Sequence, residues 1–261
     1  MNAAVSPATQ GPPRDAAQDY ERYTDTRRAH WEKDARARQR WRGVGGYYHE
    51  RLQQIYRAQV PAGQRVLELG CGPGDILAAV GPSRGVGVDL SPTTIELARR
   101  RHPGLAFHVG DAHDLSAIEG PFDVVIISDL LNDLWDVQQV VGEVGRLSHP
   151  GTRLVLNNYS RLWEQPLEAA SSLRLARPTL HQNWLTVEDL TNLLYLADFE
   201  VVRRWEEVLW PVRTPLIDSL ANRYLVKLWP FRLLALTNFI VARPRRGRAC
   251  RCPRLGRRSR A

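Results

Sequence analysis

The chain has 261 residues, a length typical of one α/β domain with short extensions, and its 43% hydrophobic content is ordinary for a globular protein. Its net charge of +8 comes from the C-terminus, because residues 243–261 hold nine arginines and no acid, which leaves −1 for the rest. This distribution argues against the broad basic surface that a nucleic-acid-binding domain uses.

Helices without strands are predicted for the first part of the chain. Residues 1–18 are rich in Ala, Pro and Gln and lack the features of a signal peptide, so we expect them to be disordered. Residues 19–42 are highly charged with interspersed aromatic residues and predict one or two amphipathic helices. A glycine-rich break at residues 43–46 separates them from residues 47–57, whose apolar side chains have helical spacing. A turn at residues 61–63 then leads into the first strand.

The central part of the chain alternates between apolar strands and helices. The predicted strands are residues 65–69, 85–89, 106–109, 122–128 and 153–157. The predicted helices are residues 74–80, a helix that starts at Ser91-Pro92 and ends near residue 101, and residues 137–147. Pro150-Gly151 is expected to turn into the last of these strands. Such alternation is typical of a doubly wound parallel sheet.

Two more strands are predicted near the C-terminus, at residues 199–209 and 236–243, with a helical insertion at residues 217–228 between them. A helix is expected over residues 163–177, and another from Thr186 to residue 197, because Thr186 and Asp189 have the spacing of a capping box. The predicted fold is therefore α/β, with a Rossmann-like, doubly wound, mostly parallel seven-stranded sheet and N-terminal helices. No uninterrupted apolar run of 18 residues occurs, so no transmembrane segment is expected.

The most informative motif is the glycine-rich turn after the first strand, residues 70–74. Glycines let a ligand approach the backbone closely, and Asp75 takes the place of the third glycine of a dinucleotide-binding loop, which disfavours NAD. Asp89 ends the second strand, where an acid can accept hydrogen bonds from both hydroxyls of a ribose. Glu68, inside an apolar strand, favours a ligand with an ammonium group. A nucleoside joined to an amino acid describes S-adenosylmethionine.

In this arrangement the chain resembles the class I S-adenosylmethionine-dependent methyltransferases. The resemblance covers roughly residues 41–243 and includes Gly110-Asp111-Ala112 and residues 122–125. It implies S-adenosylmethionine as cofactor, with Glu68 and the glycine loop around its methionine part, Asp89 at the ribose, and Asp111 with the Ala112 N–H at the adenine. The cofactor-binding residues that we expect are Glu68, Gly70, Cys71, Gly72, Gly74, Asp89, Leu90, Asp111, Ala112 and Ser128.

A catalytic base is not identified by the sequence. The side chains that could move a proton are Asp129, Asp133, Tyr159, His181 and Asn183, and each also suits packing or a structural hydrogen bond. Residues 47–49 could roof the pocket. No metal site is expected, because Cys250 and Cys252 have no companion ligands nearby in the sequence. Three cysteines form no disulfide framework, which favours a reduced, cytoplasmic compartment.

The segments at residues 156–164, 182–185 and 236–244 look like the methyltransferase half of bacterial proteins that join a methyltransferase to a family 2 glycosyltransferase. That resemblance implies a saccharide or small-molecule acceptor, a glycosyltransferase partner and a role in surface polysaccharide assembly. The alternatives are a methyltransferase for a quinone, lipid or other metabolite, and a cofactor-binding partner of a glycosyltransferase that does not catalyse. Nucleic acid is not an expected partner, and Asn157-Asn158-Tyr159 lacks the prolines of the base-flipping amino-methylating enzymes.

We divide the chain into a disordered N-terminus (1–18), an N-terminal helical region (19–60), a methyltransferase domain (61–244) and an Arg-rich tail (245–261). The tail is either a disordered basic extension or the out-of-frame translation of GC-rich DNA, and because such translation yields Arg, Pro, Gly and Ala, we favour the second interpretation.

Overall fold

The computed structural model describes residues 16–38, 46–172, 180 and 182–245. Its centre is a seven-stranded sheet with the order β3-β2-β1-β4-β5-β7-β6. The strands are β1 (Arg65–Leu69), β2 (Arg84–Asp89), β3 (Ala106–Val109), β4 (Phe122–Ile127), β5 (Ser148–Tyr159), β6 (Phe199–Glu207) and β7 (Thr237–Pro244). The first five strands pair in parallel, and β7 runs antiparallel to both of its neighbours. The predicted doubly wound, mostly parallel sheet is confirmed.

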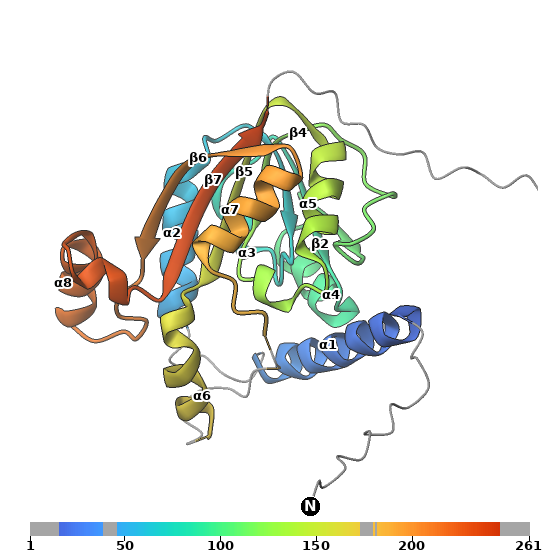
Figure 1. The fold of residues 1–261 in the computed structure, drawn as a ribbon. Helices are drawn as coiled ribbons and strands as arrows, with labels where there is room; N and C mark the ends of the chain where they lie inside the picture. The colour runs from blue at the N-terminus through green and yellow to red at the C-terminus, as the bar shows by residue number, and fades with distance from the viewer. Residues whose placement is uncertain (1–15, 39–45, 173–179, 181, 246–261) are drawn as a thin grey trace, which may run out of the picture.

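Helices cover both faces of this sheet (Figure 1). On one face lie α2 (Gly46–Gln59), α3 (Asp75–Ala79) and α4 (Pro92–Arg101), and on the other lie α5 (Val137–Arg146) and α7 (Val187–Leu196). Because side chains alternate along a strand, Val66 joins the core under α2 while Leu67 and Leu69 join the core under α5. The long helix α1 (Ala16–Arg38) lies beside α4 at the end of the sheet.

Two expected boundaries differ in the structure. The first helix begins at Ala16, so residues 16–18 are helical and not disordered, while residues 1–15 and 246–261 lie outside the described ranges. Strand β5 begins at Ser148, and the expected turn at Pro150-Gly151 is part of it. The pairing of β4 with β5 is irregular there, and Thr152 Oγ1 accepts a hydrogen bond from the His149 N–H at 2.8 Å. A side-chain bond therefore replaces the regular ladder at this point.

The C-terminal elements follow the predicted order. The capping box of α7 is present, with 3.1 Å from the Asp189 N–H to Thr186 Oγ1 and 2.9 Å from the Thr186 N–H to Asp189 Oδ2. The helix expected from residue 163 begins as the short turn η2 (Arg161–Trp163) and continues as α6 (Glu164–Ser172). The insertion forms α8 (Ile217–Arg223) and the turns η3 (Leu225–Lys227) and η4 (Phe231–Leu234). Across the described residues, we find no helix with the length and apolarity needed to cross a bilayer.

Candidate active site

A cavity of about 750 Å³ opens at the carboxyl ends of β1, β2 and β4, beneath α1 and α2. This is the point where the strand order reverses, at which open α/β sheets bind their ligands. Nine of the ten residues expected to bind the cofactor line it: Glu68, Gly70, Cys71, Gly72, Asp89, Leu90, Asp111, Ala112 and Ser128. The tenth, Gly74, is the last residue of the loop and the N-cap of α3, and it does not line the cavity.

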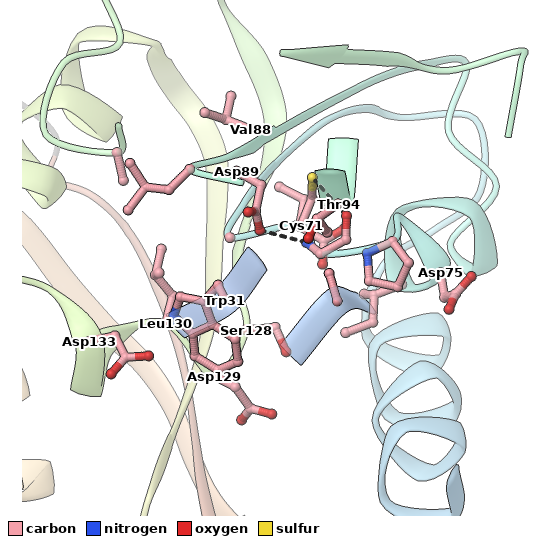
Figure 2. Close-up of a pocket in the computed structure, with 18 of the residues that line it drawn as sticks. Trp31, Cys71, Asp75, Val88, Asp89, Thr94, Ser128, Asp129, Leu130 and Asp133 are labelled. Atoms are coloured by element: carbon pink, nitrogen blue, oxygen red, sulfur yellow. Dashed lines mark hydrogen bonds between the residues drawn. The ribbon is translucent and has the colours of Figure 1, made fainter. Parts of the chain in front are cut away.

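The glycine loop is tied to the end of β2 through one carboxylate. Asp89 Oδ2 accepts a hydrogen bond from the Gly72 N–H at 3.0 Å (Figure 2). The other carboxylate oxygen, Oδ1, accepts one from the Ser91 N–H at 2.9 Å. Gly74 has a φ of +80° and lies so close to β3 that a Cβ there would approach Phe107 Cζ to 2.6 Å. A side chain at position 74 would therefore strain the backbone and push the loop away from the sheet.

Glu68 is buried beneath this loop, with an exposed fraction of 1%. Its Oε2 accepts a hydrogen bond from the Leu77 N–H, in the first turn of α3, at 3.0 Å. Burial raises the pKa of Glu68 well above its usual range, the Leu77 bond opposes this, and the nearby carboxylates of Asp75 and Asp89 add to the rise. A cation bound beside Glu68 would favour its ionised form.

Acidic side chains dominate the charge around the cavity. Seven acids line it against two arginines, and they are Glu50, Glu68, Asp75, Asp89, Asp111, Asp129 and Asp133. Figure 2 shows Asp89, Asp129 and Asp133 on different elements around this space. Within the described ranges, no group of three or more His, Cys, Asp or Glu side chains is arranged to hold a metal ion. The field of such a lining favours a ligand that carries positive charge.

Asp111, which follows β3, is held by two neighbours. Its Oδ2 accepts a hydrogen bond from the Tyr20 hydroxyl at 2.5 Å, and its Oδ1 accepts bonds from the backbone N–H and the ring Nδ1 of His113 at 3.0 and 2.6 Å. The His113 Nε2 accepts from the Asp136 N–H at 3.1 Å, so the ring proton belongs on Nδ1. Burial alone would raise the pKa of Asp111, but the bonds from His113 and Tyr20 lower it to about 2.

Helix α1 forms part of the cavity wall, a role that we did not expect from the sequence. Tyr23, Arg27 and Trp31 line the cavity, and the Tyr23 hydroxyl lies 3.4 Å from the carbonyl oxygens of Asp133 and Leu134. The signal is present in the sequence, because these three aromatic and basic residues recur at intervals of four on one face of a helix. Their spacing alone does not say what that face packs against.

Asp133 lines the cavity as a base candidate, and so does Asp129. It follows β4 with a φ of +52°, a left-handed conformation that short polar residues tolerate. Its Oδ1 accepts hydrogen bonds from the Tyr48 hydroxyl at 2.9 Å and from Asn157 Nδ2 at 2.5 Å. Tyr159 is not among the cavity-lining residues that the structure describes, and its ring stacks on Tyr48 with the centroids 6.2 Å apart.

The remaining candidates are distributed differently. Asn183 Nδ2 donates to the Leu134 carbonyl at 2.6 Å, so this side chain supports the wall of the cavity. His181 lies outside the described residues. Of the three residues expected to roof the pocket, His49 lines it, whereas the Tyr47 hydroxyl accepts from Asn222 Nδ2 at 3.0 Å on the far side of α2. Only part of the expected roof therefore comes from α2.

Comparison with known families gives the same assignment as the geometry. The family model described as "Methyltransferase domain" matches residues 61–200, which is more than half of the chain. The chain belongs to this family. It is therefore an S-adenosylmethionine-dependent methyltransferase domain.

Relatives of this methyltransferase domain include bacterial enzymes. A protein of Mycolicibacterium smegmatis named "Probable S-adenosylmethionine-dependent methyltransferase" is 31% identical over 164 residues, 59% of this chain and 60% of that protein. The demethylmenaquinone methyltransferase of Beutenbergia cavernae is 37% identical over 110 residues, 41% of this chain and 45% of that protein. The chain thus spans less than two thirds of the length of both relatives.

A solved structure shows the same fold. The S-adenosylmethionine-dependent methyltransferase of Thermotoga maritima superposes with a TM-score of 0.62 at 18% identity, covering 82% of this chain and 97% of that one. The residues of this methyltransferase domain fit the cofactor chemically, because S-adenosylmethionine carries an ammonium and a sulfonium and the cavity holds a surplus of carboxylates, including the buried Glu68.

Proposed function

We propose that this chain methylates a small-molecule acceptor that enters the cavity beside the cofactor. The observation that supports this most directly is the lining itself, in which Asp89 braces the glycine loop and seven acids face a space of about 750 Å³. That volume suits a drug-sized ligand. A carboxylate-rich lining fits the cationic cofactor, and a neutral acceptor adds no charge that this lining would have to compensate.

Each part of the proposed cofactor site has its own physical role. Asp89, at the end of β2, accepts hydrogen bonds from the ribose hydroxyls, and Glu68 with the glycine loop receives the ammonium end. Asp111 and the backbone of Ala112 contact the adenine from the end of β3. Ser128, at the end of β4, lies on the side of the reacting centre. These roles agree with the general observation that open α/β sheets bind their ligands at the carboxyl ends of the strands.

For methyl transfer, the protein must align the acceptor atom with the methyl group, exclude water and, for some acceptors, remove a proton. When bound, the cofactor supplies a methyl group on a sulfonium, which is an electrophile. Helices α1 and α2 form part of the cavity wall, and we assign to them the exclusion of water. We assign to Asp129 the removal of a proton from an acceptor hydroxyl, and this role is supported by the hydrogen bonds from Tyr48 and Asn157 that orient its carboxylate.

The test is the affinity for S-adenosylmethionine measured by calorimetry. Asp89→Ala removes a charged acceptor that would bind both ribose hydroxyls, each bond contributing about 1.5–3 kcal/mol, so we expect a loss of about tenfold or more. Glu96→Ala removes an exposed carboxylate from α4, and should leave the affinity within about twofold. Unchanged affinity in folded Asp89→Ala protein would contradict the proposed site.

The acceptor class is the finer part of the proposal. A small molecule or saccharide, with a glycosyltransferase partner in surface polysaccharide assembly, is our first candidate, and a quinone or lipid is the second, which the name of the Beutenbergia relative favours. Release of S-adenosylhomocysteine in the presence of sugars, quinols and lipid alcohols distinguishes these candidates. Cofactor binding without release for any of the three classes would favour the third candidate, a non-catalytic partner of a glycosyltransferase.

A further inference from the structure

The insertion between β6 and β7, residues 209–236, carries most of the exposed large apolar side chains of the described chain. Eleven of the seventeen lie there. They are Trp210, Val212, Leu216, Ile217, Leu220, Tyr224, Leu228, Trp229, Phe231, Leu233 and Leu234. Figure 1 shows α8 and the turns after it projecting beyond the end of β6. Clusters of this kind on a protein surface mark a binding surface. We call these residues the apolar insertion surface.

The insertion is firmly held to the rest of the fold, so its exposure does not come from a loose loop. Asn222 is buried, and its Nδ2 donates a hydrogen bond to the Tyr47 hydroxyl of α2 at 3.0 Å. Val226 is buried beneath the insertion, and the Trp163 Nε1 donates to the Leu234 carbonyl at 2.9 Å. The inner side chains fix the insertion and leave the apolar insertion surface facing outward.

The charged residues of the insertion indicate what kind of partner the apolar insertion surface would bind. Arg223, Lys227 and Arg232 are exposed within the insertion, and its acid, Asp218, is buried. Trp229 is 74% exposed beside these cations, and Tyr224 is 56% exposed. Tryptophan and tyrosine among leucines, flanked by lysine and arginine, is the composition of segments that lie in the headgroup region of a bilayer. Anionic lipid headgroups supply the complementary charge.

We propose that the apolar insertion surface docks this enzyme on an anionic lipid bilayer, with the tryptophan and leucine side chains in the interface and the cations at the headgroups. The surface is joined to the cavity through α2, because Glu50 lines the cavity and forms an ion pair with Arg213 of the insertion. A docked enzyme would hold its cavity next to the membrane surface. This docking is independent of the acceptor that we propose above.

The experiment is co-sedimentation of the full chain, without cofactor, with phosphatidylcholine vesicles that contain about 30 mol% phosphatidylglycerol. Three substitutions in one variant, Leu228→Gln, Trp229→Gln and Leu233→Gln, replace side chains that are all more than half exposed. We expect this variant to bind at least about tenfold more weakly. The matched control replaces Leu162, Leu196 and Val202 by Gln, at similar exposure elsewhere on the surface, and should bind within about twofold of the native chain.

The Arg-rich C-terminus could attract anionic vesicles by itself, and salt separates the two contributions. At about 0.5 M NaCl, screening weakens attraction through arginines, whereas apolar insertion persists, so the native chain should stay bound and the insertion variant should not. Equal binding of native chain and insertion variant would overturn the proposal. Failure of the native chain to bind, together with self-association in ultracentrifugation that the insertion variant abolishes, would show that the surface pairs with a second copy.

Discussion

Asp129 is the acidic residue that sits where β4 ends and the cavity begins. Its left-handed backbone turns the carboxylate back toward Tyr48 and Asn157, and these two donors hold Oδ1, so the group is oriented before any acceptor arrives. Asparagine keeps the size and tolerates the same backbone conformation, but cannot take up a proton at neutral pH. The substitution therefore separates proton transfer from structure.

For Asp129→Asn we predict a fall in kcat of about 100-fold or more, because general bases contribute in this range, with the Kd for S-adenosylmethionine within about threefold. The measurement is release of S-adenosylhomocysteine with an acceptor that supports turnover in the native chain. Asp136→Asn is the control, since Asp136 caps α5 through the Gln139 N–H at 3.0 Å and asparagine caps equally well. Unchanged kcat in Asp129→Asn would remove this residue from the proton path.

Asp133 makes stability depend on pH. Burial raises its pKa to about 6, although Arg27, whose Nε lies 3.8 Å from Asp133 Oδ1, opposes the rise. Because the folded state binds the proton more tightly than the unfolded state, the Asp133 contribution to stability is present below about pH 4 and is lost as pH rises through about 6. The direction is the reverse of that for a carboxylate with a lowered pKa.

The free energy of unfolding of the native chain minus that of Asp133→Asn should therefore fall between pH 4 and pH 7, by up to about 3 kcal/mol. In Asp133→Asn, Arg27 loses its carboxylate partner at both pH values, so this cost to the free energy of unfolding cancels when the differences at pH 4 and pH 7 are compared. Urea titrations of both proteins at the two pH values measure it. A difference that stays level or rises with pH would show that Asp133 is ionised throughout.

At the scale of elements, helix α1 is held against the domain largely by contacts with residues around the cavity. It contacts the domain through Tyr20 on Asp111, Tyr23 on the carbonyls after β4, and the Tyr23 ring edge-on to Trp135 at 5.0 Å. Its mean hydropathy is low and Asp19 and Asp25 point to solvent-exposed arginines, so its own sequence provides little apolar anchoring. Hydrogen bonds to the cavity wall therefore contribute much of its docking.

Replacing both Tyr20 and Tyr23 by Phe should weaken this docking by about 2 kcal/mol, two net hydrogen bonds of about 1 kcal/mol each. The expected result is about a 30-fold faster hydrogen exchange in residues 16–38, with exchange in β1 and β4 unchanged. Tyr195→Phe, which removes the hydroxyl from an exposed tyrosine of α7, is the control. Equal exchange in α1 of the double variant and the native chain would show that apolar packing holds this helix.

For the whole molecule, the contacts of Arg245 show that the domain reaches at least this residue. The Arg245 N–H donates to the Asp198 carbonyl at 2.8 Å, and its guanidinium lies 4.5 Å from the centre of the Tyr195 ring. The sequence that follows has no apolar periodicity and no acid to balance its arginines. We therefore expect the tail after Arg245 to be dispensable for the fold.

A chain that ends at Arg245 should keep its melting temperature within about 2 °C and its affinity for S-adenosylmethionine within about twofold. Differential scanning calorimetry and titration calorimetry measure the two quantities on the shortened and full chains. A clear loss in either would mean that the tail packs on the domain. The frame of the tail is a separate question, which the nucleotide sequence answers.

The strands, their order along the chain and the position of most candidate cofactor residues around the cavity were predictable from the sequence, because short apolar runs, helix caps and the glycine loop act locally. The capping box of Thr186 and Asp189 can be recognised within four residues of sequence, and Asp89 is the last residue of its strand. The irregular start of β5 and the division of the insertion into short turns were not predictable, because they depend on pairing with β4 and on the buried Asn222.

The sequence by itself determined the fold class and the cofactor, and it predicted the end of the sheet at which the cavity lies, since all three follow from local patterns and from the tendency of open α/β sheets to bind ligands at the carboxyl ends of their strands. Tertiary structure alone decided that Tyr20 reaches Asp111 from 91 positions away, that Asp129 faces the cavity while Tyr159 packs behind Tyr48, and that the apolar side chains of the insertion remain exposed. The physical reason is that each of these contacts depends on which distant parts of the chain pack together. The spacing of residues along a helix or strand specifies the face on which a side chain lies, but not the element that this face contacts.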